Sequence, residues 1–249
     1  MLDFTGYKVV VTGGSRGIGR ATALAFAGKG AAVSICARGE SSLRQTETEL
    51  SRQSGKVHAA ICDLADAQAI QRYIAEAAAA LGGIDVLINN ATGFSDETVD
   101  AWKDCLAVDV MAAVRAADAA LPHLARSGHA SIINISSISG LRASARTPAY
   151  AAAKAALIQY TTSQALVLAA KAIRVNCIAP GSVEFPGGYW ESCKTTDPDL
   201  YKATLDSIPF GRYGRAEEIA NVAIFLASPL ASWITGQTVV ADGGQLLTG

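Results

Sequence analysis

Short runs rich in β-branched and other apolar residues alternate along the chain with alanine-rich stretches. The apolar runs are residues 7–12, 31–36, 56–62, 85–90, 130–136, 173–179 and 237–241. Each has the length of a strand, and most segments between them repeat apolar positions with the period of a helix. This alternation predicts an α/β fold in which helices cover both faces of a parallel sheet. Ligands of such sheets bind beyond the carboxyl ends of the strands, so the residues directly after each run are candidates for function.

No linker, repeat or low-complexity tract interrupts the alternation, so residues 1–249 are predicted to form one domain. The one irregular stretch runs from about Pro180 to Pro209 and begins with the sequence PGSVEFPGGYW. An insertion of this length in a compact domain is more often functional than idle. We therefore predict a substrate lid near residues 182–209.

Residues 155–170 carry no charge, yet they include two glutamines and two threonines. These polar side chains argue against a membrane span, and we expect a helix at a subunit contact instead. The first twenty residues lack the charged start, apolar stretch and cleavage site of a secretion signal. They favour a cytoplasmic protein.

Composition narrows the functional classes. Of the 249 residues 50% are hydrophobic and 17% are charged, which excludes an intrinsically disordered chain. The net charge of -1 gives no electrostatic reason to expect a nucleic acid or an anionic membrane as a partner. The five cysteines and three histidines lack the spacing of a disulfide framework or a zinc site, so we expect no metal. A protein that acts on a small molecule fits this composition best.

A glycine-rich turn directly follows the first apolar run and precedes a helical stretch. Glycines let a main chain approach a pyrophosphate closely, and the exposed N–H groups at a helix start favour its negative charge. The alternative is an ordinary tight turn between a strand and a helix. The order of strand, turn and helix favours nucleotide binding. The predicted cofactor contacts of this turn are Gly13, Ser15, Arg16, Gly17, Ile18 and Gly19.

Arg38 closely follows the second apolar run, at a position where an enzyme that prefers NAD usually has an acidic residue. An arginine there forms a bidentate pair with a 2′-phosphate, and Arg16 can approach the same group, so we predict NADP (NADPH). The alternative is a pair of solvated surface arginines. Asp63 and Leu64 follow the third run and are further predicted cofactor contacts. Asp63 can accept a hydrogen bond from the adenine amino group or cap the helix that follows.

Three residues suit proton transfer. Ser137 follows the fifth run, and Tyr150 and Lys154 lie four positions apart, which places them on one face of a predicted helix. A phenol with a pKa near 10 needs a decrease of about 3 units to act near neutral pH, and an ammonium at ~4 Å supplies about that much at an effective dielectric of ~20. We therefore predict that Lys154 lowers the pKa of Tyr150. Alone, the pair could be an ordinary surface tyrosine and lysine.

The ordered motifs resemble the short-chain dehydrogenase/reductase family over nearly the whole chain. TGGSRGIG at 12–19 is similar to the cofactor loop, Asn89 to Thr92 resembles the NNAG motif, and Ser137, Tyr150 and Lys154 match the catalytic Ser-Tyr-x-x-x-Lys. Later in the chain, further matches to motifs of this family lie at residues 174–176, 180–181, 235–237 and 242–244. The resemblance implies a single Rossmann-type, doubly wound domain with a seven-stranded parallel sheet. It also implies hydride transfer between nicotinamide and a carbonyl or alcohol carbon, and a homotetramer joined partly through the Tyr-Lys helix.

The resemblance implies a role for each matched residue. Tyr150 would be the acid and base, Ser137 would steady the substrate oxygen, and Lys154 would hold the nicotinamide ribose. Asn90 and Val183 match positions that contact the nicotinamide half of the cofactor, and further predicted cofactor contacts are Pro180 and Gly181.

Three positions depart from the family pattern. Thr92 replaces the last glycine of NNAG, and Phe185 stands where many relatives have a threonine that binds the nicotinamide carboxamide. Asp109 occupies the usual position of a fourth catalytic residue, an asparagine. An ionised Asp109 at ~8 Å from the phenol, at an effective dielectric of ~20, would raise the pKa of Tyr150 by about 1.5 units. We favour the ionised form because Lys154 is near; a neutral Asp109 and one that points away are the alternatives.

The predicted lid carries aromatic residues. Phe185, Tyr189 and Trp190 favour a hydrophobic or cyclic substrate, unless these rings only pack on their own domain. Arg142 and Arg146 could pair with a substrate carboxylate or phosphate, or be solvated.

We predict an NADP-dependent oxidoreductase acting on a carbonyl or secondary alcohol. The alternative is an NADP-binding sensor or scaffold protein whose catalysis is weakened by Asp109.

Overall fold

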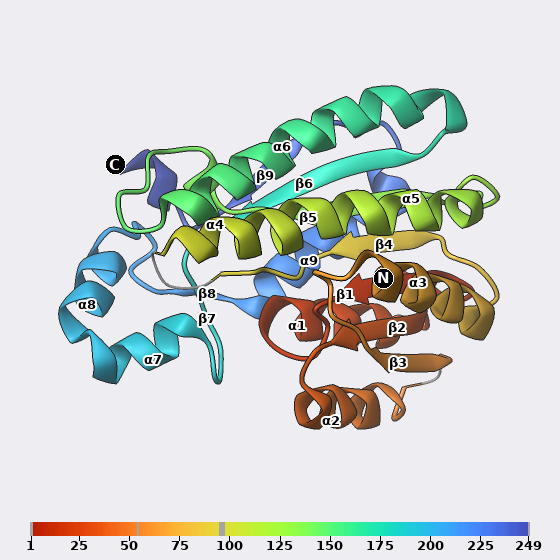
Figure 1. Ribbon diagram of the computed structural model, residues 1–249, viewed down its shortest axis with the longest axis horizontal. Helices are drawn as coiled ribbons and strands as arrows, with labels where there is room; N and C mark the ends of the chain where they lie inside the picture. The colour runs from red at the N-terminus through yellow and green to blue at the C-terminus, as the bar shows by residue number, and fades with distance from the viewer. Residues whose placement is uncertain (1, 54, 95–97, 249) are drawn as a thin grey trace.

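The computed structural model describes residues 2–53, 55–94 and 98–248. Across these residues seven strands form one sheet, in which every neighbouring pair is parallel, in the order β3-β2-β1-β4-β5-β6-β9 (Figure 1). The strands are β1 Lys8–Thr12, β2 Ala32–Ala37, β3 Val57–Ile61, β4 Val86–Asn89, β5 Ser131–Ile135, β6 Arg174–Pro180 and β9 Thr238–Ala241. Each lies within or overlaps one of the seven apolar runs, and the predicted α/β fold is confirmed.

Helices cover both faces of the sheet (Figure 1). One group packs on the first face: α1 Gly17–Ala27, α2 Glu40–Leu50 and α9 Ala216–Ala227. The other group packs on the second face: α3 Ala67–Leu81, α5 Ala112–Leu124 and α6 Pro148–Leu168. α4 Val99–Cys105 is joined to α5 by a π-helical turn, Leu106–Met111.

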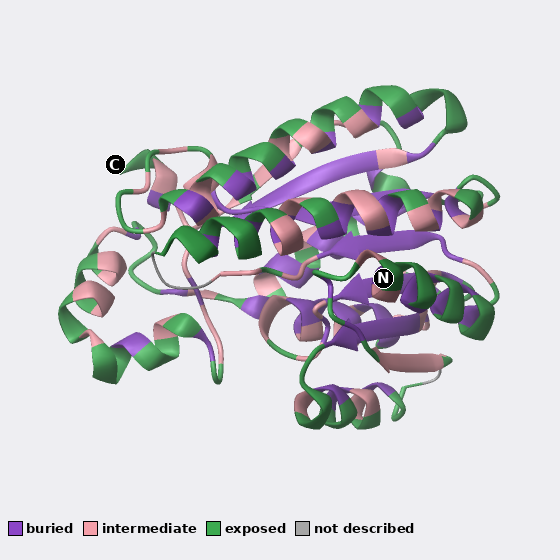
Figure 2. Cartoon of the chain, in the orientation of Figure 1, coloured by how far each residue is buried: buried purple, intermediate pink, exposed green. Residues whose placement is uncertain are grey.

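The central strands have no polar face because the sheet is covered on both sides. In β1, Val9 and Val11 enter one hydrophobic core and Val10 enters the other. Side chains alternate across a strand, so an apolar run without alternation is what a doubly covered sheet requires. Figure 2 shows these strands as buried, whereas much of the outer helix surfaces is exposed.

The strand order changes direction between β1 and β4. β1 continues to β2 on one side, whereas β4 leads to β5 on the other. A crevice forms at such a point beyond the carboxyl ends of the two strands. The main-chain N–H of Asn90, directly after β4, donates to the Thr12 hydroxyl at the end of β1 at 3.1 Å and fixes the two ends together.

Residues 182–209 are more regular than the sequence predicted. They contain strand β7 Val183–Glu184 and two helices, α7 Tyr189–Thr196 and α8 Pro198–Asp206, which extend beyond the sheet (Figure 1). The Asp197 carboxylate accepts from the Leu200 main-chain N–H at 3.1 Å, and Pro198 follows it at the helix start. This cap and proline explain the helix that a search for apolar periodicity missed.

The uncharged segment 155–170 lies mostly on α6, as expected. Leu166 and Val167 on this helix are 80% and 73% exposed, which is unusual for adjacent large apolar side chains. The predicted homotetramer stays a prediction. None of the helices in the described ranges is long and apolar enough to cross a membrane.

Candidate active site

A cavity of about 800 Å³ opens at the carboxyl ends of the strands. It collects residues from the glycine turn, from the ends of β2, β3, β4 and β5, from α6 and from the segment after β6. The predicted cofactor residues on its wall are Gly13, Ser15, Arg16, Ile18, Gly19, Arg38, Asp63, Leu64, Asn90, Tyr150, Lys154, Pro180, Gly181 and Val183. Ser137 lies on the same wall, whereas Gly17 and Asp109 lie just outside it.

The glycine turn is shaped so that the main chain forms the cavity wall. A Cβ on Gly19 would overlap the Gly13 carbonyl oxygen and the Asn90 amide, so only glycine fits there. The Asn90 Nδ2 donates to the carbonyl oxygens of Thr12 and Gly13 at 3.1 and 3.0 Å. The turn is thereby fixed at the start of α1, where helix N–H groups favour a pyrophosphate. These residues fit a dinucleotide.

Arg16 lies in the glycine turn and Arg38 lies directly after β2, and both are exposed side chains on the cavity wall. Asp63 does not cap the following helix, since its Oδ1 accepts from the Ala65 N–H at 3.0 Å and Asp66 is the residue that caps α3. The cap interpretation of Asp63 is therefore wrong.

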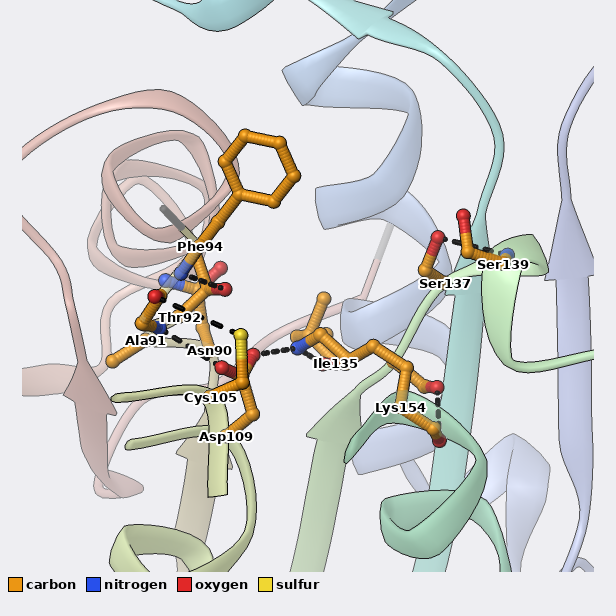
Figure 3. A network of polar contacts seen from close by, with 12 residues as sticks. Asn90, Ala91, Thr92, Phe94, Cys105, Asp109, Ile135, Ser137, Ser139 and Lys154 are labelled. Atoms are coloured by element: carbon orange, nitrogen blue, oxygen red, sulfur yellow. Dashed lines mark hydrogen bonds and ion pairs between the residues drawn. The ribbon is translucent and has the colours of Figure 1, made fainter. Parts of the chain in front are cut away.

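Lys154 connects the catalytic candidates. Its Nζ donates to the Ile135 carbonyl oxygen at 2.8 Å and lies 2.8 Å from Asp109 Oδ1 (Figure 3). It also lies 5.5 Å from the centre of the Tyr150 ring, one helical turn away. Ser137, at the end of β5, faces the same cavity as Tyr150. The helical spacing thus brings Tyr150 and Lys154 together as predicted.

The pKa of Tyr150 is raised above its ordinary value, contrary to the prediction. Burial disfavours the phenolate most, Lys154 and Ser137 lower the pKa, and Asp109 raises it again. The spacing of these residues accounted for the charges of Lys154 and Asp109 but not for burial, which is the largest effect. The pKa of Lys154 is also raised: burial lowers it, but the charges of Asp109 and Tyr150 more than compensate. Near neutral pH the site therefore holds a neutral phenol beside an ammonium.

Asp109 lies in the π-helical turn and is only 1% exposed. The alternative in which it points away is wrong, because its Oδ1 is paired with Lys154 and its Oδ2 accepts from the Gly93 N–H at 2.9 Å. A π turn rotates the following residues relative to an α-helix and is common at functional sites.

An aromatic wall borders the cavity. The Phe94 ring lies edge-on to Tyr150 and to Tyr189, with ring centres 5.2 and 5.3 Å apart, and Tyr189 continues to Trp190 at 5.1 Å. These four rings also pack on one another. Contact with a hydrophobic substrate and packing within the domain are therefore compatible interpretations of the lid aromatics. The sequence analysis missed Phe94, although its place shortly after β4 was a usable signal.

Three candidates named from the sequence remain, and their side chains lie in different surroundings. The Phe185 ring lies against the glycine turn, because a Cβ on Gly17 would come within 2.6 Å of its Cζ. Arg142 Nη1 contacts the Gln245 carbonyl oxygen at 3.5 Å and lines the cavity. Arg146 lies 3.5 Å from Asp197 and also lines the cavity, so both interpretations of this arginine stay open. Gln245 is a second cavity residue that the sequence analysis missed.

In the described part of the chain, no group of three His, Cys, Asp or Glu side chains is placed to hold a metal ion. The site instead combines a dinucleotide cradle with a phenol, a hydroxyl and an ammonium. This combination defines an oxidoreductase of the nucleotide-dependent type.

Comparisons with known proteins agree with this class. A family profile described as Enoyl-(Acyl carrier protein) reductase matches residues 13–245. The isoepoxydon dehydrogenase patN of Aspergillus clavatus is 40% identical over 245 residues, which cover 96% of this chain and 94% of that protein. The 2,5-dichloro-2,5-cyclohexadiene-1,4-diol dehydrogenase LinX of Sphingobium indicum is 36% identical over 244 residues, covering 96% of each protein.

One solved structure is similar to this chain over nearly its whole length. The short-chain dehydrogenase from Burkholderia cenocepacia, solved in complex with NADP, superposes with a TM-score of 0.90 at 30% identity and covers 98% of this chain and 99% of that one. The chain therefore belongs to the short-chain dehydrogenase/reductase family. It is an NAD(P)-dependent oxidoreductase that acts on carbonyl or alcohol substrates.

Proposed function

We propose that this protein is an NADP-preferring reductase and dehydrogenase of a hydrophobic or cyclic carbonyl/alcohol pair. The observation that carries the proposal is one cavity with a dinucleotide cradle at one end and Ser137, Tyr150 and Lys154 at the other. The substrate belongs beside the phenol, against the aromatic wall of Phe94, Tyr189 and Trp190.

Each catalytic residue has a task that its surroundings support. The Tyr150 phenol is protonated near neutral pH, because its pKa is raised mainly by burial, and it donates its proton to the carbonyl oxygen during reduction. The Ser137 hydroxyl orients the same oxygen. Lys154 donates one ammonium hydrogen to Ile135 and is paired with Asp109, so a further hydrogen is available to a ribose hydroxyl. The nicotinamide supplies or accepts the hydride when it is bound.

The reduction should be detectable by steady-state NADPH absorbance with a panel of carbonyl compounds. The alternative function, a sensor or scaffold protein, requires that the protein bind NADPH without consuming it. Substrate-dependent consumption supports the enzyme, whereas tight NADPH binding with no consumption across the panel supports the scaffold.

We expect NADPH to be preferred over NADH by about 10- to 1000-fold, since a charge-assisted arginine contact contributes about 1.5 to 3 kcal/mol and two arginines can share the 2′-phosphate. Replacing Arg38 by aspartate should reduce or invert this preference, measured as kcat/KM with each cofactor. Arg52→Asp is the matched control, because Arg52 is an exposed arginine outside the cavity. Equal kcat/KM for the two cofactors in the unmodified protein would contradict the proposal.

The aromatic wall supports a bulky apolar substrate. LinX is named for a cyclohexadiene diol, which is a cyclic alcohol. Tyr189→Ala should raise KM for a cyclic ketone by about 10-fold, because truncating a half-buried ring removes roughly half of the 1.5 to 3 kcal/mol expected for full burial. The Kd for NADPH should stay within about two-fold.

Trp102→Ala is the control for Tyr189→Ala. Trp102 is 43% exposed, close to the 44% of Tyr189, and it lies on α4 outside the cavity wall. If small polar sugars were better substrates than every bulky ketone, the assignment of the aromatic wall would have to be abandoned.

A further inference from the structure

We propose that Asp109 is a positioning residue whose carboxylate holds the ammonium of Lys154 and the main chain before Phe94 in one fixed arrangement. The aromatic wall and the proton-transfer group are thereby coupled through one buried side chain. This inference rests on the proposed function and deepens it, since it assigns a task to a residue that departs from the family pattern.

The two oxygens of Asp109 face two donors from different parts of the fold. Oδ1 lies 2.8 Å from Lys154 Nζ on α6, and Oδ2 accepts from the Gly93 N–H after β4 at 2.9 Å (Figure 3). A carboxylate accepts with both oxygens, whereas a carboxamide has one acceptor oxygen and one NH₂ donor. An asparagine in this orientation would turn a donor toward Lys154 or toward Gly93. A carboxylate can therefore face both donors at once, whereas a carboxamide can accept from only one of them.

The main chain at Gly93 is held from a second side. A Cβ on Gly93 would overlap the Asp104 carbonyl oxygen, and the Cys105 thiol donates to the Gly93 carbonyl oxygen at 3.8 Å. Phe94 is the next residue, and its ring contacts Tyr150 edge-on. Releasing Gly93 from Asp109 therefore loosens the ring that borders the catalytic phenol.

The same carboxylate controls the charge of the site. Asp109 and Lys154 are both almost fully buried, so they compensate each other's charge. The other titratable groups facing them are Tyr150 on α6, Cys105 on α4 and Cys177 on β6. Burial raises the pKa of each thiol to about 11, so both thiols stay neutral in mildly alkaline solution.

Neutralising Asp109 leaves the site with one net positive charge. A proton then leaves the site more easily, whether Tyr150 or Lys154 loses it, because both macroscopic titrations respond to the same field. A unit charge removed at about 8 Å from the Tyr150 phenol, at an effective dielectric of ~20, moves the titration of that phenol by about 1.5 pH units.

The primary test is the pH profile of kcat/KM for ketone reduction in Asp109→Asn. We expect the limb on which activity falls with rising pH to move about 1.5 units toward acid. We also expect KM for a cyclic ketone to rise about 5-fold or more, since Phe94 is loosened. An unshifted profile would overturn the proposal, because a residue with only a structural role lowers stability without moving the titration.

Two further variants separate the effect of the Asp109 charge from the effect of the aromatic wall. Asp104→Asn removes the same charge from an exposed position on α4 and should leave the profile and KM unchanged. Phe94→Ala should raise KM for the cyclic ketone and move the pH limb less than Asp109→Asn does, because both charges of the pair remain. A profile that moves equally in Asp104→Asn and Asp109→Asn would show a general charge effect and refute the pairing.

Thermal unfolding tests the pair without any activity measurement. Lys154→Met should lower the Tm because Asp109 loses its buried partner, and adding Asp109→Asn to that variant should restore at least half of the loss. No restoration would contradict the pairing, even if Asp109→Asn alone failed to fold. If the unmodified protein reduced no ketone, the proposed function would fail while this double-variant result still decided the pairing.

Discussion

Replacing Tyr150 by phenylalanine is expected to lower kcat/KM for ketone reduction by about 10²- to 10⁴-fold, the range that a positioned general acid contributes. The phenol of Tyr150 lies on the cavity wall and is protonated near neutral pH. The phenylalanine ring of the variant keeps the edge contact with Phe94. Cofactor binding should therefore change by no more than a few-fold. Steady-state kinetics and an NADPH fluorescence titration measure the two effects separately.

Tyr160→Phe is the matched control for this substitution. Tyr160 lies on the same helix, outside the cavity wall, and its hydroxyl accepts from Gln164 at 2.8 Å. Its replacement should leave kcat/KM unchanged. If Tyr150→Phe retained a tenth of the activity, another group would have to donate the proton.

Lys154→Met is expected to damage activity, cofactor binding and stability together. The ammonium supports the phenol and is available to a ribose, and its loss leaves the buried carboxylate of Asp109 without a cation. Breaking a buried pair from one side costs about 3 to 5 kcal/mol. For a chain of this size, each kcal/mol lowers the Tm by about 2 to 4 °C, so a decrease on the order of 10 °C should appear.

Lys171→Met serves as the control, since Lys171 is exposed just beyond the end of α6. It should keep the Tm, the Kd for NADPH and kcat/KM close to those of the unmodified protein. An undiminished affinity for NADPH in Lys154→Met would remove the ribose contact from the proposal. An undiminished Tm would mean that Asp109 and Lys154 do not pair in solution.

The sheet could be predicted because its strands obey one simple constraint. A strand covered on both faces, such as β1, must be apolar at consecutive positions, and that pattern is visible in Val9, Val10 and Val11. The glycine turn was equally predictable, since the overlap at Gly19 is a local requirement of the chain. α8 was missed because its start depends on capping by Asp197 more than on a long apolar stripe, and α7, with 8 residues, is too short to show such a stripe.

The electrostatics of the site could not be predicted from spacing. Lys154 and Tyr150 are one turn apart, but Asp109 is 45 positions from Lys154 and reaches it only through the π-helical turn. The sign of the Tyr150 pKa shift depends on burial, which no local sequence pattern gives. The place of Phe94 shortly after β4 is visible in the sequence, but its contact with Tyr150 depends on the folded arrangement of β4 and α6.

A single-turnover experiment addresses the function most directly. The protein with bound NADPH is mixed rapidly with a cyclic ketone, and the absorbance of the reduced nicotinamide is followed. We expect a decay that requires the ketone, that Tyr150→Phe suppresses by at least about 100-fold, and whose rate is constant through neutral pH because the phenol stays protonated. A stable NADPH signal in the presence of every ketone, despite demonstrable cofactor binding, would contradict the assignment of this protein as a carbonyl reductase.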